Sequence, residues 1–350
     1  MAHVTERENY LMIMRGEQPL WVPRNTTYSP MFPKDPYQKY PSVKQGFMSS
    51  AEQSPYPPTA EGNRVDIWGV EYVATADTGG MALPKPGVFR LEDITKWHEV
   101  VKAPDLSDIN WELTNQRDLE RAALDRENYV ITQGIGGLGY FQYLMELMGF
   151  TEGLCAMYEE PESVKEMFDY MSDFYLTIAK NTIDYSKPDM VGLTDDTATA
   201  NDPFVSMEMF RELLKPFYKK ELQPALDRGI PVEIHNCGRC EDQIEDWFDL
   251  GIIGWNPAQT MNDLEGIKAK YGNKLFLCGC WDSSGPVGQA DATEEFVREQ
   301  VRETIDKFAK GGGFVFWGSV YGPAGDEYTI NKKRWLTEEV ETYGRTFYNK

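Results

Sequence analysis

The chain has 350 residues, of which 41% are hydrophobic, and its 56 acidic and 35 basic residues give a formal net charge of −21. This composition is that of a folded protein with a large core, and it excludes an intrinsically disordered chain. The excess of negative charge would repel nucleic acid and anionic membrane surfaces, so we expect neither as a partner, whereas a basic partner protein stays open.

The first hundred residues are expected to form an elaboration of the main fold. No apolar signal segment opens the chain and it contains no run of 18 apolar residues, so we expect a cytoplasmic protein. Residues 5–16 are predicted to form a short helix that begins with a capping box of Thr5 and Glu8. Residues 28–62, rich in Pro, Tyr, Ser and Gln, are expected to be irregular, and residues 65–91 to hold a few short strands.

From residue 129 onward, short apolar runs alternate with segments of helical periodicity. The strands are predicted at residues 129–132, 190–193, 232–236, 252–255, 274–280 and 314–317. The helices are predicted near residues 139–148, 160–187, 206–228, 241–250, 262–271, 292–310 and 330–348. Apolar strands that alternate with helices indicate a parallel sheet covered on both faces, and their number favours a closed (β/α)8 TIM barrel over an open sheet. We therefore expect an α/β protein with a single domain over residues 1–350, in which residues 1–100 are the N-terminal helical and irregular elaboration.

A group of polar residues ends the strand predicted at 232–236. Alternate residues of a strand share a face, so Glu233, His235 and Cys237 are expected to point the same way. Polar residues at the carboxyl end of a barrel strand are typical of an active site. Imidazole and thiolate are both zinc ligands, and the spacing of one residue between His235 and Cys237 suits a single ion. The sequence therefore predicts a metal site at His235 and Cys237.

The remaining cysteines supply a candidate for a third ligand. Phe276, Cys278 and Cys280 share a face if the strand predicted at 274–280 runs to its end, and Cys280 would then lie nearest the barrel mouth. We predict Cys280 as the third zinc ligand. Cys155 and Cys278 are interpreted as small buried hydrophobes, as unpaired cysteines often are. A catalytic zinc with three protein ligands keeps one position open, where it deprotonates a thiol or polarises an ether oxygen.

Other candidate site residues are carboxylates and aromatic rings. Asp195 and Asp196 follow the strand predicted at 190–193, where they would either act as a general acid or base or cap a turn or helix. Both are predicted as catalytic residues. The candidates for substrate binding are Tyr28, Trp68, Glu233, Trp281 and Tyr321. For the aromatic members of this set, the alternative is a place in the hydrophobic core.

Seven short segments, taken in chain order, resemble the uroporphyrinogen decarboxylase superfamily. They are Thr5-Glu6-Arg7-Glu8-Asn9-Tyr10-Leu11, Arg15-Gly16-Glu17, Val22-Pro23, Asp66-Ile67-Trp68-Gly69-Val70, Asp195-Asp196-Thr197-Ala198, Pro203-Phe204-Val205-Ser206 and His235-Asn236-Cys237-Gly238. The decarboxylases of this superfamily carry several arginines after the first strand, where this chain has only Arg24. The chain is more similar to the corrinoid-dependent methyltransferase branch, whose zinc motif is His-x-Cys with a distant cysteine.

This resemblance implies a zinc enzyme that works with a separate corrinoid protein. Such methyltransferases move a methyl group to or from the cobalamin of that partner, and the O-demethylase type acts on methoxylated aromatics. In the coenzyme-thiol methyltransferases the third ligand follows the last barrel strand, where this chain has Ser319. Cys280 or a carboxylate would then complete the site. This departure favours a substrate that is not a thiol.

The leading hypothesis is a zinc-dependent methyltransferase that demethylates a small substrate, a methoxy-aromatic. In that reading His235, Cys237 and Cys280 hold the zinc, and Asp195 or Asp196 protonates or positions the leaving group. The alternatives are a uroporphyrinogen-type decarboxylase and a non-catalytic barrel that binds a tetrapyrrole or corrinoid. The methyl donor, the direction of transfer and a homodimeric state stay open.

Overall fold

The structure, a computed structural model, describes residues 4–25, 27–28, 44–75, 82–283, 285–289, 291–322 and 325–349, with only the backbone of residues 27–28. Most of the segment that was predicted to be irregular, residues 29–43, therefore lies outside the described residues.

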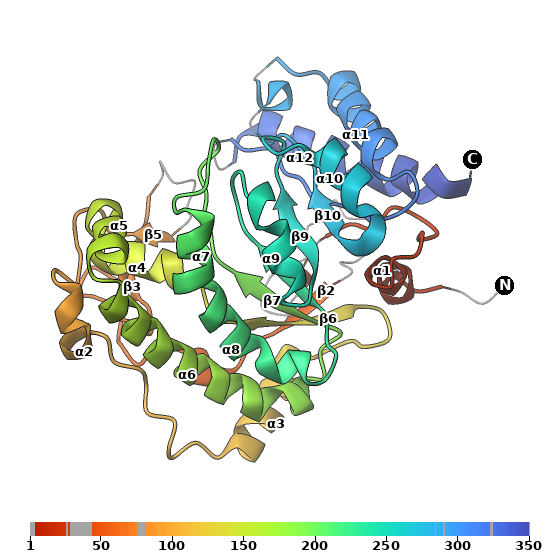
Figure 1. Ribbon diagram of the computed structural model, residues 1–350. Helices are drawn as coiled ribbons and strands as arrows, with labels where there is room; N and C mark the ends of the chain where they lie inside the picture. The colour runs from red at the N-terminus through yellow and green to blue at the C-terminus, as the bar shows by residue number, and fades with distance from the viewer. Residues whose placement is uncertain are drawn as a thin grey trace.

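Eight parallel strands form one curled sheet of the TIM-barrel type (Figure 1). In spatial order they are β1 (Thr27–Tyr28), β2 (Lys44–Phe47), β6 (Val130–Ile135), β7 (Met190–Thr194), β8 (Val232–His235), β9 (Ile252–Ala258), β10 (Phe276–Gly279) and β11 (Phe314–Phe316). The residues just before β1 meet β11, because Asn25 N–H donates to the Phe316 carbonyl at 2.9 Å and Phe316 N–H donates to the Pro23 carbonyl at 2.9 Å.

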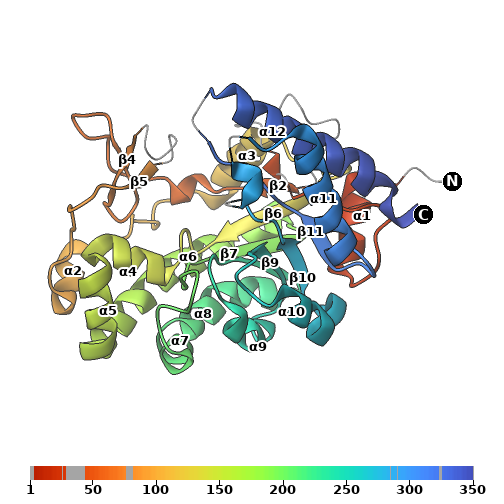
Figure 2. The same ribbon diagram turned by 90° about the horizontal axis from the view of Figure 1, so that it is seen from above.

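Helices between the strands cover the outside of the sheet. They are α4 (Tyr140–Met148), α5 (Phe150–Glu159), α6 (Pro161–Ser186), α7 (Met207–Leu213), α8 (Lys215–Leu226), α9 (Ile244–Phe248), α10 (Leu264–Tyr271), α11 (Glu294–Phe308) and α12 (Glu327–Glu339). In Figure 2, α6 to α10 lie along one side of the strands, with α11 and α12 on the other. The predicted alternation of strands and helices is confirmed, but the helix predicted at 206–228 is two helices, because Pro216 starts the second.

The N-terminal elements close one end of the sheet and extend one side. Helix α1 (Glu6–Met14) is capped by Thr5, whose hydroxyl accepts the Glu8 N–H at 3.2 Å, which is the Thr5 half of the predicted capping box. Its Tyr10 and Ile13 join an inner cluster completed by Val130, Met190, Phe276, Cys278 and Val315 of the strands. Because several of these strand residues are the first of their strands, α1 covers the end of the barrel opposite the strand carboxyl ends.

A small antiparallel sheet lies beside α4 and α5 (Figure 1), formed by β3 (Arg64–Val65), β4 (Glu71–Ala74) and β5 (Ala82–Pro84). It is the strand-rich elaboration predicted at 65–91, and it is followed by α2 (Trp97–Val100) and α3 (Trp111–Ala122). Tyr72 of β4 donates a hydrogen bond to Glu146 of α4 at 2.6 Å, which ties this sheet to the barrel helices. None of the helices in the described part of the chain is long and apolar enough to cross a membrane.

One layer of paired residues crosses five neighbouring strands inside the barrel. Gly134, Gly192, Glu233, Gly254 and Phe276 occupy matching positions from β6 to β10. A methyl group added at Gly254 would overlap the Phe276 ring, whereas one added at Gly134 would meet nothing within 4 Å. The Phe276 ring therefore fits in the interior because residue 254 has no side chain. No atom of the described residues fills the equivalent space beside Gly134.

We expect Gly254→Ala to lower the free energy of unfolding by about 1–3 kcal/mol, because the added methyl forces Phe276 to move within a packed interior. Gly134→Ala is a matched control, since it also lies in a strand without a left-handed φ, and it should change stability by less than about 0.5 kcal/mol. Urea denaturation of both variants measures the difference, and equal losses would contradict this account of the interior layer.

Candidate metal centre

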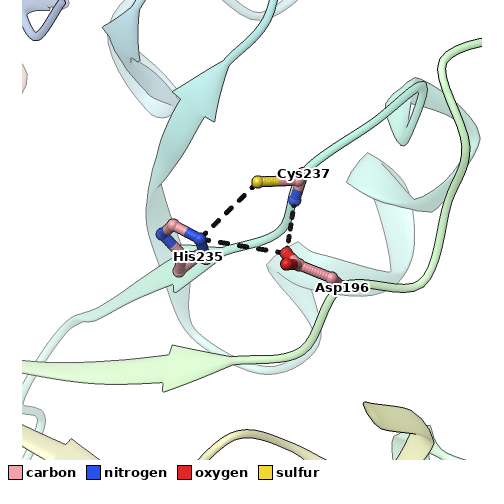
Figure 3. Close-up of side chains that lie close together, drawn as sticks. All are labelled: Asp196, His235 and Cys237. Carbon is pink, nitrogen blue, oxygen red and sulfur yellow. Dashed lines mark hydrogen bonds and ion pairs between the residues drawn. The ribbon is translucent and has the colours of Figure 1, made fainter. Parts of the chain in front are cut away.

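Three side chains converge where β7 and β8 end. His235 is the last residue of β8, Cys237 follows it by two positions, and Asp196 lies two residues beyond β7. The two strands are parallel neighbours in which Thr194 pairs with His235, so their carboxyl ends lie side by side. Figure 3 shows the imidazole, the thiol and the carboxylate directed toward a common space.

The distances within this group suit one metal ion. His235 Nε2 lies 3.7 Å from Cys237 Sγ and 3.8 Å from Asp196 Oδ1, and one ligand atom from each residue lies within 4.8 Å of the others. Tetrahedral zinc bonds of ~2.0–2.3 Å separate neighbouring ligand atoms by about 3.3–3.8 Å. Among the described residues, this is the one group of three or more His, Cys, Asp or Glu side chains with such geometry.

The imidazole of His235 is oriented by a neighbouring strand. His235 Nδ1 lies 2.8 Å from Oδ1 of Asn256, which pairs with His235 in the register of β8 and β9. An amide oxygen only accepts, so Nδ1 carries the proton and the lone pair of Nε2 faces Cys237 and Asp196. A metal-binding histidine is commonly fixed in this way by an acceptor at its other nitrogen.

The electrostatics of the group also favour a cation. Burial first, and then the neighbouring negative charge of Asp196, together raise the pKa of the Cys237 thiol to about 12. Asp196 stays close because its Oδ1 accepts the Cys237 N–H at 2.8 Å. A divalent cation among these atoms would remove the penalty on the thiolate, so the carboxylate, imidazole and thiol together fit a zinc ion.

Cys280, the predicted third ligand, is not part of this group, and Asp196 stands there instead. The predicted alternation holds for Phe276 and Cys278, whose side chains belong to the inner cluster. It ends with β10 at Gly279, because Gly279 and Cys280 have φ angles of 132° and 57° that turn the chain. The Cys280 side chain consequently packs into the outer core between sheet and helices.

Asp195, predicted as catalytic, is fully buried and caps a helix. Its carboxylate accepts the backbone N–H groups of Phe141 at 2.9 Å and Gln142 at 3.0 Å, in the first turn of α4. It also accepts the hydroxyl of Tyr218 at 2.6 Å. This is the capping role that the sequence left open for the acidic pair. The adjacent Asp196 is thereby carried on an anchored segment and turned toward His235.

The predicted substrate-binding residues are dispersed. Trp68 is fully buried, and its indole donates to the Tyr175 hydroxyl at 3.1 Å, so it belongs to the core and does not reach a substrate. Glu233 faces the barrel interior, where it forms a buried ion pair with Lys44. The side chain of Tyr28 lies outside the described residues.

The two remaining aromatic candidates, Trp281 and Tyr321, lie in the segments that follow β10 and β11. Trp281 is largely buried, and its indole donates to the Ser319 carbonyl at 2.9 Å. Tyr321 is 66% exposed. An aromatic ring that contacts the metal group is Trp317, whose centre lies 6.3 Å from that of His235. Trp317 follows β11 directly, which is the signal that marks it as a residue of the barrel mouth.

An apolar cavity of about 350 Å³ lies beside the metal group. Its walls include Phe89, Phe141, Phe150 and Phe204, and Asp196 also lines it. Sequence analysis did not find this cavity because its rings come from segments far apart in the chain. Asn256 was missed too, although its position beside His235 follows once β8 and β9 are paired in register.

The family model of uroporphyrinogen decarboxylase (URO-D) matches residues 69–318, more than half of the chain. The chain belongs to the uroporphyrinogen decarboxylase family. No curated protein matches it in sequence. Among solved structures, a methyltransferase from Methanosarcina mazei has a TM-score of 0.58 at 13% identity, covering 97% of this chain and 99% of that one. A putative vitamin-B12 independent methionine synthase from Listeria monocytogenes gives 0.39 at 14% identity, with coverages of 64% and 66%.

A buried acidic network lies behind the segment that carries Asp196. Tyr218 donates to Asp195, and Tyr140 donates to Glu221 of the same helix as Tyr218. Burial raises the pKa of Asp195 from 3.8 to about 7 and that of Glu221 from 4.5 to about 8. The folded protein therefore holds these protons over a pH range in which the unfolded chain has released them.

The protein should accordingly lose stability as the pH rises from about 4.5 toward 8, since over that range folded Glu221 keeps a proton that the unfolded chain has released. Glu221→Gln removes this titration and should make the fall in melting temperature with pH shallower. Thermal denaturation at several pH values measures the slope. Identical slopes for the two proteins would show that Glu221 is ionised in the folded state throughout.

Proposed function

We propose that this chain is a zinc-dependent methyltransferase that takes a methyl group from a small methoxy-aromatic substrate and passes it to the cobalamin of a separate corrinoid protein. The observation that carries the proposal is the group of Asp196, His235 and Cys237 at the carboxyl ends of neighbouring parallel strands. That end of a barrel is where enzymes of this architecture place their catalytic groups.

Asp196, His235 and Cys237 would hold the zinc through oxygen, nitrogen and sulfur. Three protein ligands leave one position for substrate, which is the pattern of catalytic rather than structural zinc sites. The side chains of His235 and Asp196 are 33% and 39% exposed, so the group is accessible from the barrel mouth. When bound, the zinc would supply Lewis-acid polarisation of an ether oxygen, which makes the oxygen a better leaving group.

The chain's own residues set the orientation and protonation of this centre. Asn256 accepts the Nδ1 proton of His235, so the lone pair of Nε2 faces the metal group. The Cys237 backbone N–H fixes one oxygen of Asp196. Asp195 anchors the segment between β7 and α7 to α4 and keeps Asp196 from turning away.

The family and the structural neighbour support this choice without deciding the substrate. The Methanosarcina mazei protein is described as a methyltransferase, and its length matches this chain almost completely. At 13% identity, this likeness supports the shared fold alone, so the proposed chemistry is argued from the metal group. An oxygen ligand at Asp196 in place of a second sulfur also fits a substrate that reacts at oxygen rather than at a thiol.

Decarboxylation of a porphyrinogen is the second candidate within the family, and the placement of Arg24 disfavours it. The Arg24 guanidinium donates to Thr337 at 3.0 Å and to Glu341 at 3.4 Å. It is thus engaged by the C-terminal helical segment, whereas a porphyrinogen needs cations for its carboxylates. A non-catalytic barrel that carries a tetrapyrrole would have no use for an oriented histidine beside a thiol and a carboxylate.

The purified protein should bind about one zinc per chain, and Asp196→Asn or Cys237→Ser should weaken zinc binding by at least tenfold, because each removes an anionic ligand. Cys280→Ser is the matched control, because it changes a buried cysteine outside the metal group and should leave zinc affinity unchanged. Metal analysis with a competing chelator gives these affinities. If Cys280→Ser lost zinc and Asp196→Asn kept it, Cys280 and not Asp196 would be the third ligand.

The zinc-loaded protein should form methylcobalamin when mixed with a methoxybenzene and a reduced corrinoid protein, and His235→Ala should abolish this activity. Absorbance spectra of the corrinoid follow the conversion. No methylcobalamin across methylated ethers, thiols and amines would refute the proposal, and carbon dioxide release from uroporphyrinogen would establish the decarboxylase instead.

A further inference from the structure

We infer that the cavity beside Asp196 binds the uncharged aromatic ring of the methyl donor and excludes aromatic carboxylates. The inference deepens the proposed function and rests on it, because it names the class of substrate that reaches the metal group. It stands on three features of the cavity: its ring wall, its charges and its place next to Asp196.

Three phenylalanine rings build one continuous wall of the cavity. Phe141 and Phe204 are stacked with ring centres 5.3 Å apart, and Phe150 packs against Phe204 at 5.2 Å. Phe150 and Phe89 are nevertheless 54% and 50% exposed. Exposed aromatic side chains that gather around a cavity are typical of a ligand site, because burial of a ligand removes their apolar surface from water.

Among the described residues that line the cavity, no cation is left unpaired to receive an anion. Lys85 is the one cation among the described residues of its lining, and its ammonium is paired with Glu61 at 3.1 Å and Glu71 at 3.0 Å. The Glu146 carboxyl accepts hydrogen bonds from Tyr72 at 2.6 Å and Gln142 at 3.3 Å. A ring carboxylate that lies against Glu146, away from the zinc ligands, would therefore be desolvated without a counter-charge, which is unfavourable.

Asp196 joins the cavity to the metal group. It lines the cavity, and its Oδ1 lies 3.8 Å from His235 Nε2. A ring held against the phenylalanine wall would thus present a substituent beside the carboxylate that faces His235 and Cys237. The three wall rings pack against one another, and a flat ring can stack against such a wall. This arrangement favours a flat neutral ring.

Isothermal titration calorimetry of the zinc-loaded protein, without corrinoid protein, tests the inference with a matched pair of probes. Anisole and 4-methoxybenzoate share the ring and the methoxy group and differ by one carboxylate. We expect anisole to bind and 4-methoxybenzoate to bind at least about tenfold more weakly. Phe150→Ala and Phe89→Ala, which both alter half-exposed rings, should each weaken anisole binding by about tenfold. Phe296→Ala, at a partly buried ring of α11 outside the cavity, should leave it unchanged.

Equal affinity for the two probes, no binding of anisole, or unchanged binding in both cavity variants would each overturn the inference. Tighter binding of tetramethylammonium than of anisole would overturn it in favour of a cation site. Zinc content and methylcobalamin formation are measured on the same preparations. If both persist without the expected selectivity, the inference alone fails; if anisole binds selectively but no methyl transfer occurs, the proposed function fails.

Discussion

The register of three parallel strands is the constraint on which the candidate metal centre depends. In β7, β8 and β9, Thr194 pairs with His235 and His235 pairs with Asn256. Because parallel strands end at the same edge, this register places the carboxylate of Asp196, the imidazole of His235 and the amide that orients it within a few ångströms. A shift of one residue in β8 would turn His235 away from both neighbours.

The adjacent carboxylates of Asp195 and Asp196 have different roles because only Asp195 is buried. Asp195 accepts two backbone N–H groups of α4 and the Tyr218 hydroxyl, so its oxygens are engaged in holding the segment after β7. Asp196 is partly exposed, and one of its oxygens is fixed by the Cys237 N–H. The first aspartate supplies rigidity and the second offers a ligand atom to the proposed zinc, and a metal site needs both.

Strand periodicity predicted the parts of the site that lie within strands and failed where a strand ends. His235 was found because it alternates with Glu233 inside β8, and Cys237 lies just beyond it on the same side. Cys280 was misplaced because the positive φ angles of Gly279 and Cys280 break the alternation, and no sequence pattern of cysteines reveals that turn. The barrel sheet followed from local apolar runs, whereas the phenylalanine cavity required tertiary packing between distant segments, which periodicity does not encode.

Under the proposed function, the ligand set and the cavity favour the same chemistry. An oxygen ligand makes a zinc ion harder than a second thiolate would, which favours interaction with an ether oxygen over a thiol sulfur. The cavity that shares Asp196 is apolar and has its one described cation already paired, which favours a neutral ring over an acid. An aryl methyl ether meets both conditions at once, since its ring is uncharged and its reacting atom is oxygen. A porphyrinogen meets neither, because it carries carboxylates and loses carbon dioxide from them, so under the proposed function Asp196 and the phenylalanine rings of the cavity favour methyl transfer over decarboxylation.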